Sequence, residues 1–330
     1  MAILGIDISQ KTYDATVVTD TGARHHRQFA NTEKGFHDLD QWLSTYHVSD
    51  LHACMEATNV YWEDLAEHLF QHGYRVSVVN PARTKGFGIS QLQRNKTDNV
   101  DSGVIADFCE RLSPRLWHPP SPERRQLRDM VRHIDALKKT RTQQINRMKT
   151  CRNPLVTQSF QVIIDALNAQ IADMEAQIET LVSTHATLKE QRALLMSIQG
   201  IGATTATKIL AEMYDLDEYL NARSAAADVG VTPCHYESGT SVRRRPRLSK
   251  VGKASIRGAL YWPAISAMQH NPVVRDVKER LEKKGKSQKV IIGAAMRKLL
   301  HLSYGVLKNK IPFDANYVNR STTLTETCVN

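Results

Sequence analysis

The sequence predicts a mixed α/β domain at the N-terminus, followed by long helices and a mostly helical C-terminal region. Over the first hundred residues, short apolar strands bounded by turn residues alternate with segments whose apolar residues recur at helical spacing. A Pro-rich stretch at 112–125 interrupts this pattern, and from about Leu194 onward the chain is helical with short loops. These observations place a layered sheet domain before a helical one.

The N-terminal elements follow from these patterns in order. The strands are short apolar runs: 2–7, the two arms of a hairpin within 14–31, 51–57 and 75–81. The helices carry apolar residues on one side: 31–46, 60–74 and 95–112. Thr21-Gly22 turns the hairpin, Gly73 stops the second helix, and Pro81 ends the last strand.

Two long helices are predicted in the middle of the chain. The first spans about 123–149, and Pro154 ends or interrupts it. The second has apolar residues spaced alternately by three and four, an a/d heptad seam: Ile164, Leu167, Ile171, Met174, Ile178 and Leu181. An antiparallel hairpin that packs on itself and an intermolecular coiled coil fit this seam equally well. The predicted segments are a sheet domain at 1–115, linker and coiled-coil helices at 116–190, a helical domain at 191–315 and a polar, disordered tail at 316–330.

Composition narrows the class of protein. The chain has 330 residues, 41% hydrophobic and 24% charged, and its net charge of +10 favours nucleic acid or an acidic membrane surface as a partner. No apolar run of about 18 residues occurs, so a transmembrane helix is not expected, and the first residues do not read as a signal peptide. The five cysteines are scattered, which fits a reducing cytosol and argues against a disulfide framework or zinc knuckle.

Four acidic residues of the N-terminal region form a candidate metal site. Asp7 and Glu56 each end a predicted strand, and Asp98 and Asp101 share one face of a predicted helix. Each acid alone fits a solvated strand end or a helix cap, but converging carboxylates repel unless a cation compensates their charge. Oxygen ligands suit Mg²⁺ or Mn²⁺, and two such ions about 4 Å apart can clamp both oxygens of a phosphoryl transfer.

Several motifs resemble the DEDD transposases of bacterial insertion sequences. The N-terminal motifs are GID, CMEATNVYWEDLAEHL, VSVVNPARTKGF and RNKTDNVDSGVIADF. The C-terminal motifs are SIQGIGATTATKILAEM, ADVGVTPCHYESGTSVRRRPRLSKVGKASIRGALYWPA and KVIIGAAMRKLLHLSYGVLKNKIPFD. The resemblance covers nearly the whole chain. It implies an RNase H-like (RuvC-like) fold for the N-terminal domain and a mostly α C-terminal transposase domain.

The resemblance also implies roles for individual residues and partners. The family's four acidic metal ligands correspond to Asp7, Glu56, Asp98 and Asp101, and its catalytic serine, in the YESG motif, corresponds to Ser238. The family includes recombinases guided by a structured bridge RNA, which the element encodes and which pairs with both target and donor DNA. The resemblance implies the same use of RNA and DNA here.

The stretch after Ser238 is strongly basic. No acid occurs from Ser238 to Gly258, and seven cations follow the serine: Arg243, Arg244, Arg245, Arg247, Lys250, Lys253 and Arg257. Such cations can neutralise phosphates, although a basic run is more often only a solvated face. By itself Ser238 fits a turn residue before Gly239. No Ser-His-Asp arrangement is evident around it, so a metal could instead activate its hydroxyl.

The segment QGIGATTATKIL resembles a helix-hairpin-helix turn. Gly200 and Gly202 would let backbone N–H groups approach a phosphate at the start of a helix. A Gly-x-Gly turn between packed helices is a common structural alternative.

Together these features favour an RNA-guided DNA recombinase that transposes its own insertion sequence through a serine nucleophile. One alternative is a metal-dependent Holliday-junction resolvase that uses water, for which Ser238 is dispensable. Another is a non-catalytic nucleic-acid-binding protein, for which metal is irrelevant. Because two duplexes must be joined, a dimer or tetramer is expected. The protein is expected in the bacterial cytoplasm, associated with the nucleoid and without a membrane partner.

Overall fold

The computed structural model describes residues 1–48, 50–91, 98–213, 216, 219–238 and 242–316, with their side chains except at 98–100, 235, 237–238 and 242–246. The polar tail predicted to be disordered therefore lies almost wholly outside the described residues. The chain divides into two compact units, Met1–Pro119 and Pro120–Asn330. Each unit has a hydrophobic core of its own.

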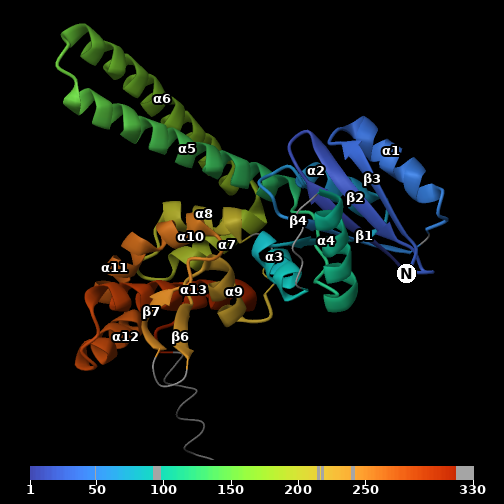
Figure 1. The fold of residues 1–330 in the computed structure, drawn as a ribbon. Coiled ribbons are helices and arrows are strands. Elements are labelled where there is room, and N and C mark those ends of the chain that lie inside the picture. Colours follow the sequence, from blue (N-terminus) through green and yellow to red (C-terminus); the bar gives the residue numbers. More distant parts are fainter. Residues whose placement is uncertain (49, 92–97, 214–215, 217–218, 239–241, 317–330) are drawn as a thin grey trace, which may run out of the picture. The chain divides into compact units, whose positions relative to one another are not determined.

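The first unit is built on a five-stranded sheet (Figure 1). Its elements are β1 (Ala2–Ile8), β2 (Thr12–Val18), β3 (Arg24–Ala30), α1 (Glu33–Ser44), β4 (Leu51–Glu56), α2 (Glu63–Gln71), β5 (Arg75–Val79), α3 (Pro81–Ser90) and α4 (Asp98–Leu112). The strand order is β3-β2-β1-β4-β5. β2 pairs antiparallel with β1 and β3, whereas β1–β4 and β4–β5 are parallel. The predicted mixed sheet that begins with a hairpin is thus confirmed.

Helices cover both faces of this sheet. Successive strand residues point to opposite faces, so Leu4 and Ile6 face one layer and Ile3 faces the other. Leu4 and Ile6 share a core with buried residues of α1 and α2. Ile3 shares a second core with Ile105 and Phe108 of α4. The first face is therefore the α1/α2 face, and the second is the α4 face.

The sequence patterns do not predict α3, since they treat Pro81 only as the end of a strand. β5 does end just before it, but the Asn80 side chain then accepts a hydrogen bond from the Ala82 amide at 2.9 Å. Asn80 is an N-cap, and Pro81 stands in the first turn, where a backbone N–H has no helical partner to lose. Asn-Pro therefore begins a helix here.

The second unit is mostly helical, as predicted. Its elements are α5 (Pro122–Thr150), α6 (Pro154–Thr184), α7 (Ala186–Met196), α8 (Ala203–Glu212), α9 (Ala222–Val229), β6 (Pro233–Ser238), β7 (Val242–Leu248), α10 (Ala254–Ala259), α11 (Tyr261–His270), α12 (Pro272–Lys283) and α13 (Gln288–Asn309). Among the described residues, α13 alone is long and apolar enough to cross a membrane. Most of it is buried inside the unit, as in the core helix of a globular domain.

α5 and α6 form a long antiparallel hairpin (Figure 1). Lys138 Nζ lies 2.6 Å from Glu175 Oε1, and the Arg141 guanidinium donates to Asn168 Oδ1 at 2.9 Å. The later residue of α5 thus contacts the earlier residue of α6, as expected for antiparallel helices. Four of the six predicted seam residues are buried: Ile164, Ile171, Ile178 and Leu181. The hairpin that packs on itself is therefore present within one chain.

A β-hairpin interrupts the C-terminal helices, so the expectation of helices with short loops from Leu194 onward is wrong at this place. β6 and β7 pair antiparallel, from Pro233 opposite Leu248 to Ser238 opposite Val242. The hairpin was not predicted because its sequence is mostly polar and lacks the regular alternation that marks a half-buried strand. Backbone pairing holds these strands together.

Candidate active site

Asp7 and Glu56 lie side by side at the carboxyl ends of two parallel strands. β1 and β4 are paired up to the residue before each acid. Asp7 shares a face with Gly5, two residues earlier, and Glu56 shares a face with Cys54, which packs in the core beneath α4. Both acids therefore belong to the α4 face of the sheet.

α4 crosses this face in the direction opposite to β1. Gly5 allows the close approach, since a Cβ there would lie 2.2 Å from the Ser102 carbonyl oxygen and 2.3 Å from the Ala106 nitrogen. Further along the helix, Cys109 Sγ lies 3.9 Å from the carbonyl oxygen of His52, near the start of β4. The first turn of α4 therefore lies towards the end of the sheet where β1 and β4 finish.

The remaining two predicted ligands belong to that first turn. Asp98 is the first residue of α4, and Asp101 directly precedes the serine that lies over Gly5. Asp101 is half-buried, whereas the side chain of Asp98 lies outside the described residues. The structure thus brings Asp7, Glu56 and the start of α4 to one end of one sheet face.

Glu56 is held by a side chain of α3. Thr84 Oγ1 donates a hydrogen bond to Glu56 Oε1, with the carbonyl oxygen of Pro81 3.0 Å away as a second acceptor. Thr84 is only 2% exposed, so its hydroxyl is fixed by the packing of α3. Sequence reasoning missed Thr84 because it missed α3. The Asn80-Pro81 cap was the signal that could have revealed it.

A fifth acid, Asp14, lies beside Asp7 on the α4 face. The two residues are direct partners in the antiparallel β1–β2 register, and such partners share a face. Asp14 is 7% exposed, and two side chains of β3 contact its carboxylate. Gln28 Nε2 donates to Oδ2 at 3.0 Å, and His26 Nε2 lies 3.2 Å from Oδ1. Sequence reasoning missed Asp14 because it looked for acids at strand ends. A lone acid within the apolar run TYDATVV was the available signal.

Ser238 is the last residue of β6, immediately before the hairpin turn. It pairs with Val242, and Glu237 pairs with Arg243 on the basic strand β7. Residues 239–241 lie outside the described part of the chain, as do the side chains of Ser238 and of the arginines at 243–245. The backbone therefore places the predicted nucleophile opposite the start of the predicted basic strand.

The other predicted phosphate-binding cations differ in their surroundings. Arg247 and Lys250 are exposed. Lys253 Nζ lies 3.1 Å from Asp228 Oδ2 and donates to the Tyr219 hydroxyl at 3.1 Å. Burial raises the pKa of Tyr219, so its hydroxyl stays protonated and donates to Asp228 at 2.7 Å. Lys253 is thus part of an internal network, and the two exposed cations are the ones open to a ligand.

Arg257 and the two predicted glycines also have defined settings. The Arg257 guanidinium donates to the Val229 carbonyl oxygen at 2.9 Å. Gly200 has a φ of 104°, and a Cβ there would lie 2.7 Å from Ala267 Cβ, so this turn packs tightly on α11. Gly202 is the N-cap of α8, and a Cβ there would meet nothing within 4 Å. Close packing accounts for Gly200, whereas no close contact requires glycine at position 202.

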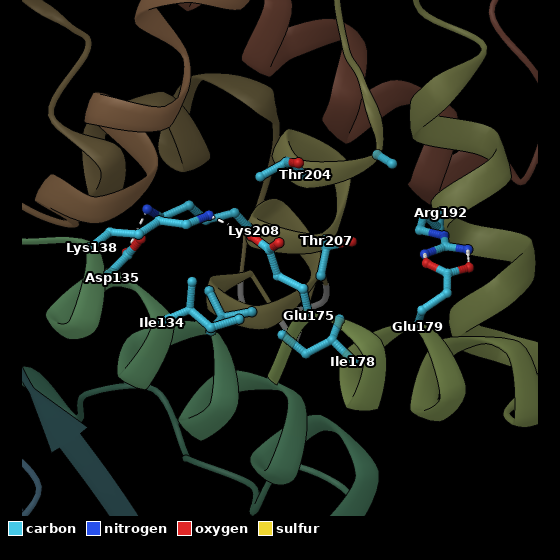
Figure 2. Close-up of a pocket in the computed structure, with 12 residues that line it drawn as sticks. Ile134, Asp135, Lys138, Glu175, Ile178, Glu179, Arg192, Thr204, Thr207 and Lys208 are labelled. Carbon is cyan, nitrogen blue, oxygen red and sulfur yellow. Dashed lines mark hydrogen bonds and ion pairs between the residues drawn. The ribbon is translucent and has the colours of Figure 1, made fainter. Parts of the chain in front are cut away.

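A cavity of about 260 Å³ lies among α5, α6, α7 and α8 (Figure 2). Its charged lining residues are paired with one another: Asp135 with Lys208, Lys138 with Glu175, and Glu179 with Arg192. Three acids balance three bases, so this lining has no net charge to attract a phosphate. The cavity is better explained as a junction between the long hairpin and α8.

Comparison with known proteins gives the family. A model of DEDD transposases, described as "Transposase", matches residues 4–153, and one described as "Transposase IS116/IS110/IS902 family" matches residues 192–279. The pilin gene-inverting proteins of Moraxella lacunata and Moraxella bovis are 32% and 31% identical over 317 residues, which cover 94% of this chain and 97% of each relative. The transposase for insertion sequence element IS1328 of Yersinia enterocolitica is 24% identical over 230 residues, 62% of this chain and 67% of the relative. The chain therefore belongs to the IS116/IS110/IS902 family of transposases, enzymes that cleave and rejoin DNA.

Proposed function

We propose that this transposase cuts and rejoins DNA through Ser238, with divalent metal held by Asp7, Glu56, Asp98 and Asp101. The observation that supports the metal site most strongly is the meeting of Asp7, Glu56 and the first turn of α4 at one end of one sheet face. Carboxylates brought to one point repel one another, and a bound cation offsets that repulsion. The strand order of the sheet supports the RNase H-like fold that the sequence resemblance implies.

The donor set fits Mg²⁺ or Mn²⁺, since all four proposed ligands are carboxylates. Divalent metal is typical of DEDD transposases. When bound, such ions polarise the scissile phosphate and lower the pKa of a nucleophilic hydroxyl. Side chains of the protein orient the proposed metal ligands. Thr84 fixes one oxygen of Glu56, and Asp14, satisfied by His26 and Gln28, flanks Asp7 without being free to move.

In the proposed reaction the Ser238 hydroxyl attacks a DNA phosphorus. The bond from phosphorus to one deoxyribose oxygen breaks, that oxygen takes up a proton, and the phosphodiester becomes a serine ester. A hydroxyl of another strand then attacks the same phosphorus and releases the serine. Because the energy of the phosphodiester is kept in the protein–DNA bond, rejoining needs no ATP. Water as nucleophile would discard that energy.

The nucleic acid is proposed to lie along the β6–β7 hairpin and the start of α8. The exposed Arg247 and Lys250 continue the run of arginines at 243–245, and such cations contact phosphates more than bases. The backbone N–H groups at the start of α8, where a Cβ on Gly202 would meet nothing within 4 Å, are proposed as a further phosphate contact. Lys253 and Arg257 support this surface from inside through their own hydrogen bonds.

We also propose that a bridge RNA directs the reaction to donor and target DNA, and that a dimer or tetramer acts. The acidic domain would be 1–115 and the serine-bearing domain 191–315, in a cytoplasmic, nucleoid-associated protein. Sequencing the RNA that copurifies with the protein tests the guide directly. The proposal expects an RNA encoded beside the gene that pairs with the flanking DNA. Recovery of only unrelated cellular RNA would contradict it.

Replacing Thr84 by Val should weaken the metal site without disturbing the fold, since Val has nearly the shape of Thr but no hydroxyl to donate to Glu56. Loss of such an outer partner typically lowers metal affinity or activity by about 10–100-fold. The Mg²⁺ concentration at half-maximal cleavage should rise accordingly, and Thr84→Ser should restore it. An unchanged Mg²⁺ midpoint in Thr84→Val would show that Glu56 does not act as a ligand through this contact.

A further inference from the structure

A second group of metal-binding side chains lies on the other side of the sheet from the acidic site. Asp40 belongs to α1, and His68 and His72 belong to the end of α2 and its C-cap. Their ligand atoms, one from each residue, all lie within 4.8 Å of one another. His37 stands one helical turn before Asp40. Because α1 and α2 cover the face opposite to α4, this His/Asp cluster is distinct from the proposed catalytic site.

The His/Asp cluster converges on one oxygen of Asp40. His68 Nε2 lies 2.8 Å, His72 Nε2 3.6 Å and His37 Nδ1 3.9 Å from Asp40 Oδ2. In a tetrahedral Zn²⁺ site with bonds of about 2.0–2.1 Å, neighbouring ligand atoms lie about 3.3 Å apart. Small shifts of these side chains therefore suffice to open a site for one ion.

The hydrogen bond made by His72 Nδ1 leaves Nε2 of the same ring able to bind a metal. His72 Nδ1 lies 2.8 Å from the carbonyl oxygen of His68. A carbonyl can only accept, so Nδ1 carries the hydrogen and, in the neutral ring, Nε2 carries a lone pair. That lone pair is on the nitrogen that faces Asp40. Fixing the tautomer of a histidine through its other nitrogen is the usual arrangement in metal sites.

The second oxygen of Asp40 is left unsatisfied by the residues that the structure describes. Oδ1 is buried and has no hydrogen-bond partner among the described residues. The three neighbouring histidines gather instead around Oδ2, although the Asp40 side chain as a whole is 24% exposed. The Asp40–His68 hydrogen bond explains His68, and the bond to the His68 carbonyl oxygen places the His72 ring, but neither contact satisfies the buried Oδ1. A dication at this point compensates the carboxylate and uses both rings.

We infer that Asp40, His68 and His72 bind a Zn²⁺ ion, with His37 within reach as a fourth ligand. Imidazole with one carboxylate is a donor set for zinc and related transition metals, whereas Mg²⁺ prefers oxygen ligands alone. His72 is 45% exposed and His37 71%, so the ion has a path from solvent. The ion ties α1 to the end of α2, and its role is to clasp these helices over the sheet.

Zinc uptake by the full-length protein tests this site. The protein is stripped with EDTA, supplied with excess Mg²⁺ to occupy the carboxylate site, and titrated with Zn²⁺ against a chromogenic chelator. Wild-type protein should bind one tight equivalent that His72→Gln lacks, with a Kd raised more than about 100-fold, beyond the loss of a mere outer partner. His133→Gln removes an exposed helical histidine elsewhere and should bind as wild type does.

Two further readings separate the site from background binding. Exposed Cys234 is shared by all three proteins, so any zinc it takes cancels in the comparison. X-ray absorption of the zinc-loaded wild type should show nitrogen and oxygen ligands at about 2.0–2.1 Å and no sulfur. Circular dichroism checks that His72→Gln is folded. Equal zinc uptake by wild type and His72→Gln, or a sulfur shell around the ion, would overturn the inference.

Discussion

Asp101→Asn should remove DNA strand cleavage while leaving the fold nearly intact. Asp101 is a half-buried residue in the first turn of α4, so the loss of one negative charge does not open the core. Metal-assisted stabilisation of a phosphoryl transfer is worth several kcal/mol, and about 1.4 kcal/mol is tenfold in rate, so we expect a loss of about 10³-fold or more. Single-turnover cleavage of labelled DNA, with the copurifying RNA and Mg²⁺, measures it.

Asp107→Asn is the matched control, because Asp107 lies on the same helix but pairs with Arg24 instead of facing the strand ends. An exposed ion pair of this kind contributes about 0–1 kcal/mol to stability, so cleavage should remain close to that of wild type. If Asp101→Asn cleaved DNA as fast as the wild type does, Asp101 would not be a ligand of the catalytic metal. An experimental structure with any two of the four carboxylates more than about 10 Å apart would exclude a single two-ion site.

Ser238→Ala should abolish strand exchange while RNA binding and folding survive. The change deletes one oxygen at the end of β6 and leaves the backbone pairing with Val242 in place. Water in place of the hydroxyl can at best hydrolyse the strand, so cut but unjoined DNA is the most that can form. The measurement is the yield of recombined product from donor and target DNA. Ser238→Cys should keep at most weak activity, because a thiolate is a soft ligand poorly matched to Mg²⁺.

Ser241→Ala is the internal control for this serine, since Ser241 stands only three residues further along the sequence, and its effect should be far milder. Recombination by Ser238→Ala at the wild-type level would show that the hairpin binds nucleic acid through its basic residues but supplies no nucleophile. The water-using resolvase would then become the better account, because it needs the same acids but no serine.

Much of the first unit could be predicted because its sequence patterns are local. Strand ends are marked by the change from apolar to polar residues, which located Asp7 and Glu56, and helical spacing located Asp101. Their meeting at one end of the sheet follows from parallel pairing, which alternation of strands and helices implies. The close approach of α4 to the sheet is explained by Gly5, but the sequence alone does not say which helix crosses it.

Features that depend on tertiary contacts were not predictable in this way. Thr84 reaches Glu56 only because α3 folds back over the end of β4, and the buried Asp14 finds its partners His26 and Gln28 on β3. The β6–β7 hairpin has almost no hydrophobic period, so its backbone pairing leaves no mark in the sequence. The His/Asp cluster joins two helices whose mutual placement is set by the core beneath them.

A covalent bond between Ser238 and DNA is the central claim, and peptide mapping of a trapped complex tests it most directly. The protein is incubated with its RNA, Mg²⁺ and nicked suicide DNA, from which the cut end diffuses away so that rejoining fails. The adduct is then digested and sequenced by mass spectrometry. We predict one modified peptide, carrying a nucleotide on Ser238 and absent from Ser238→Ala and Asp101→Asn. Active wild-type protein that leaves no adduct, or an adduct on another residue, would contradict the account.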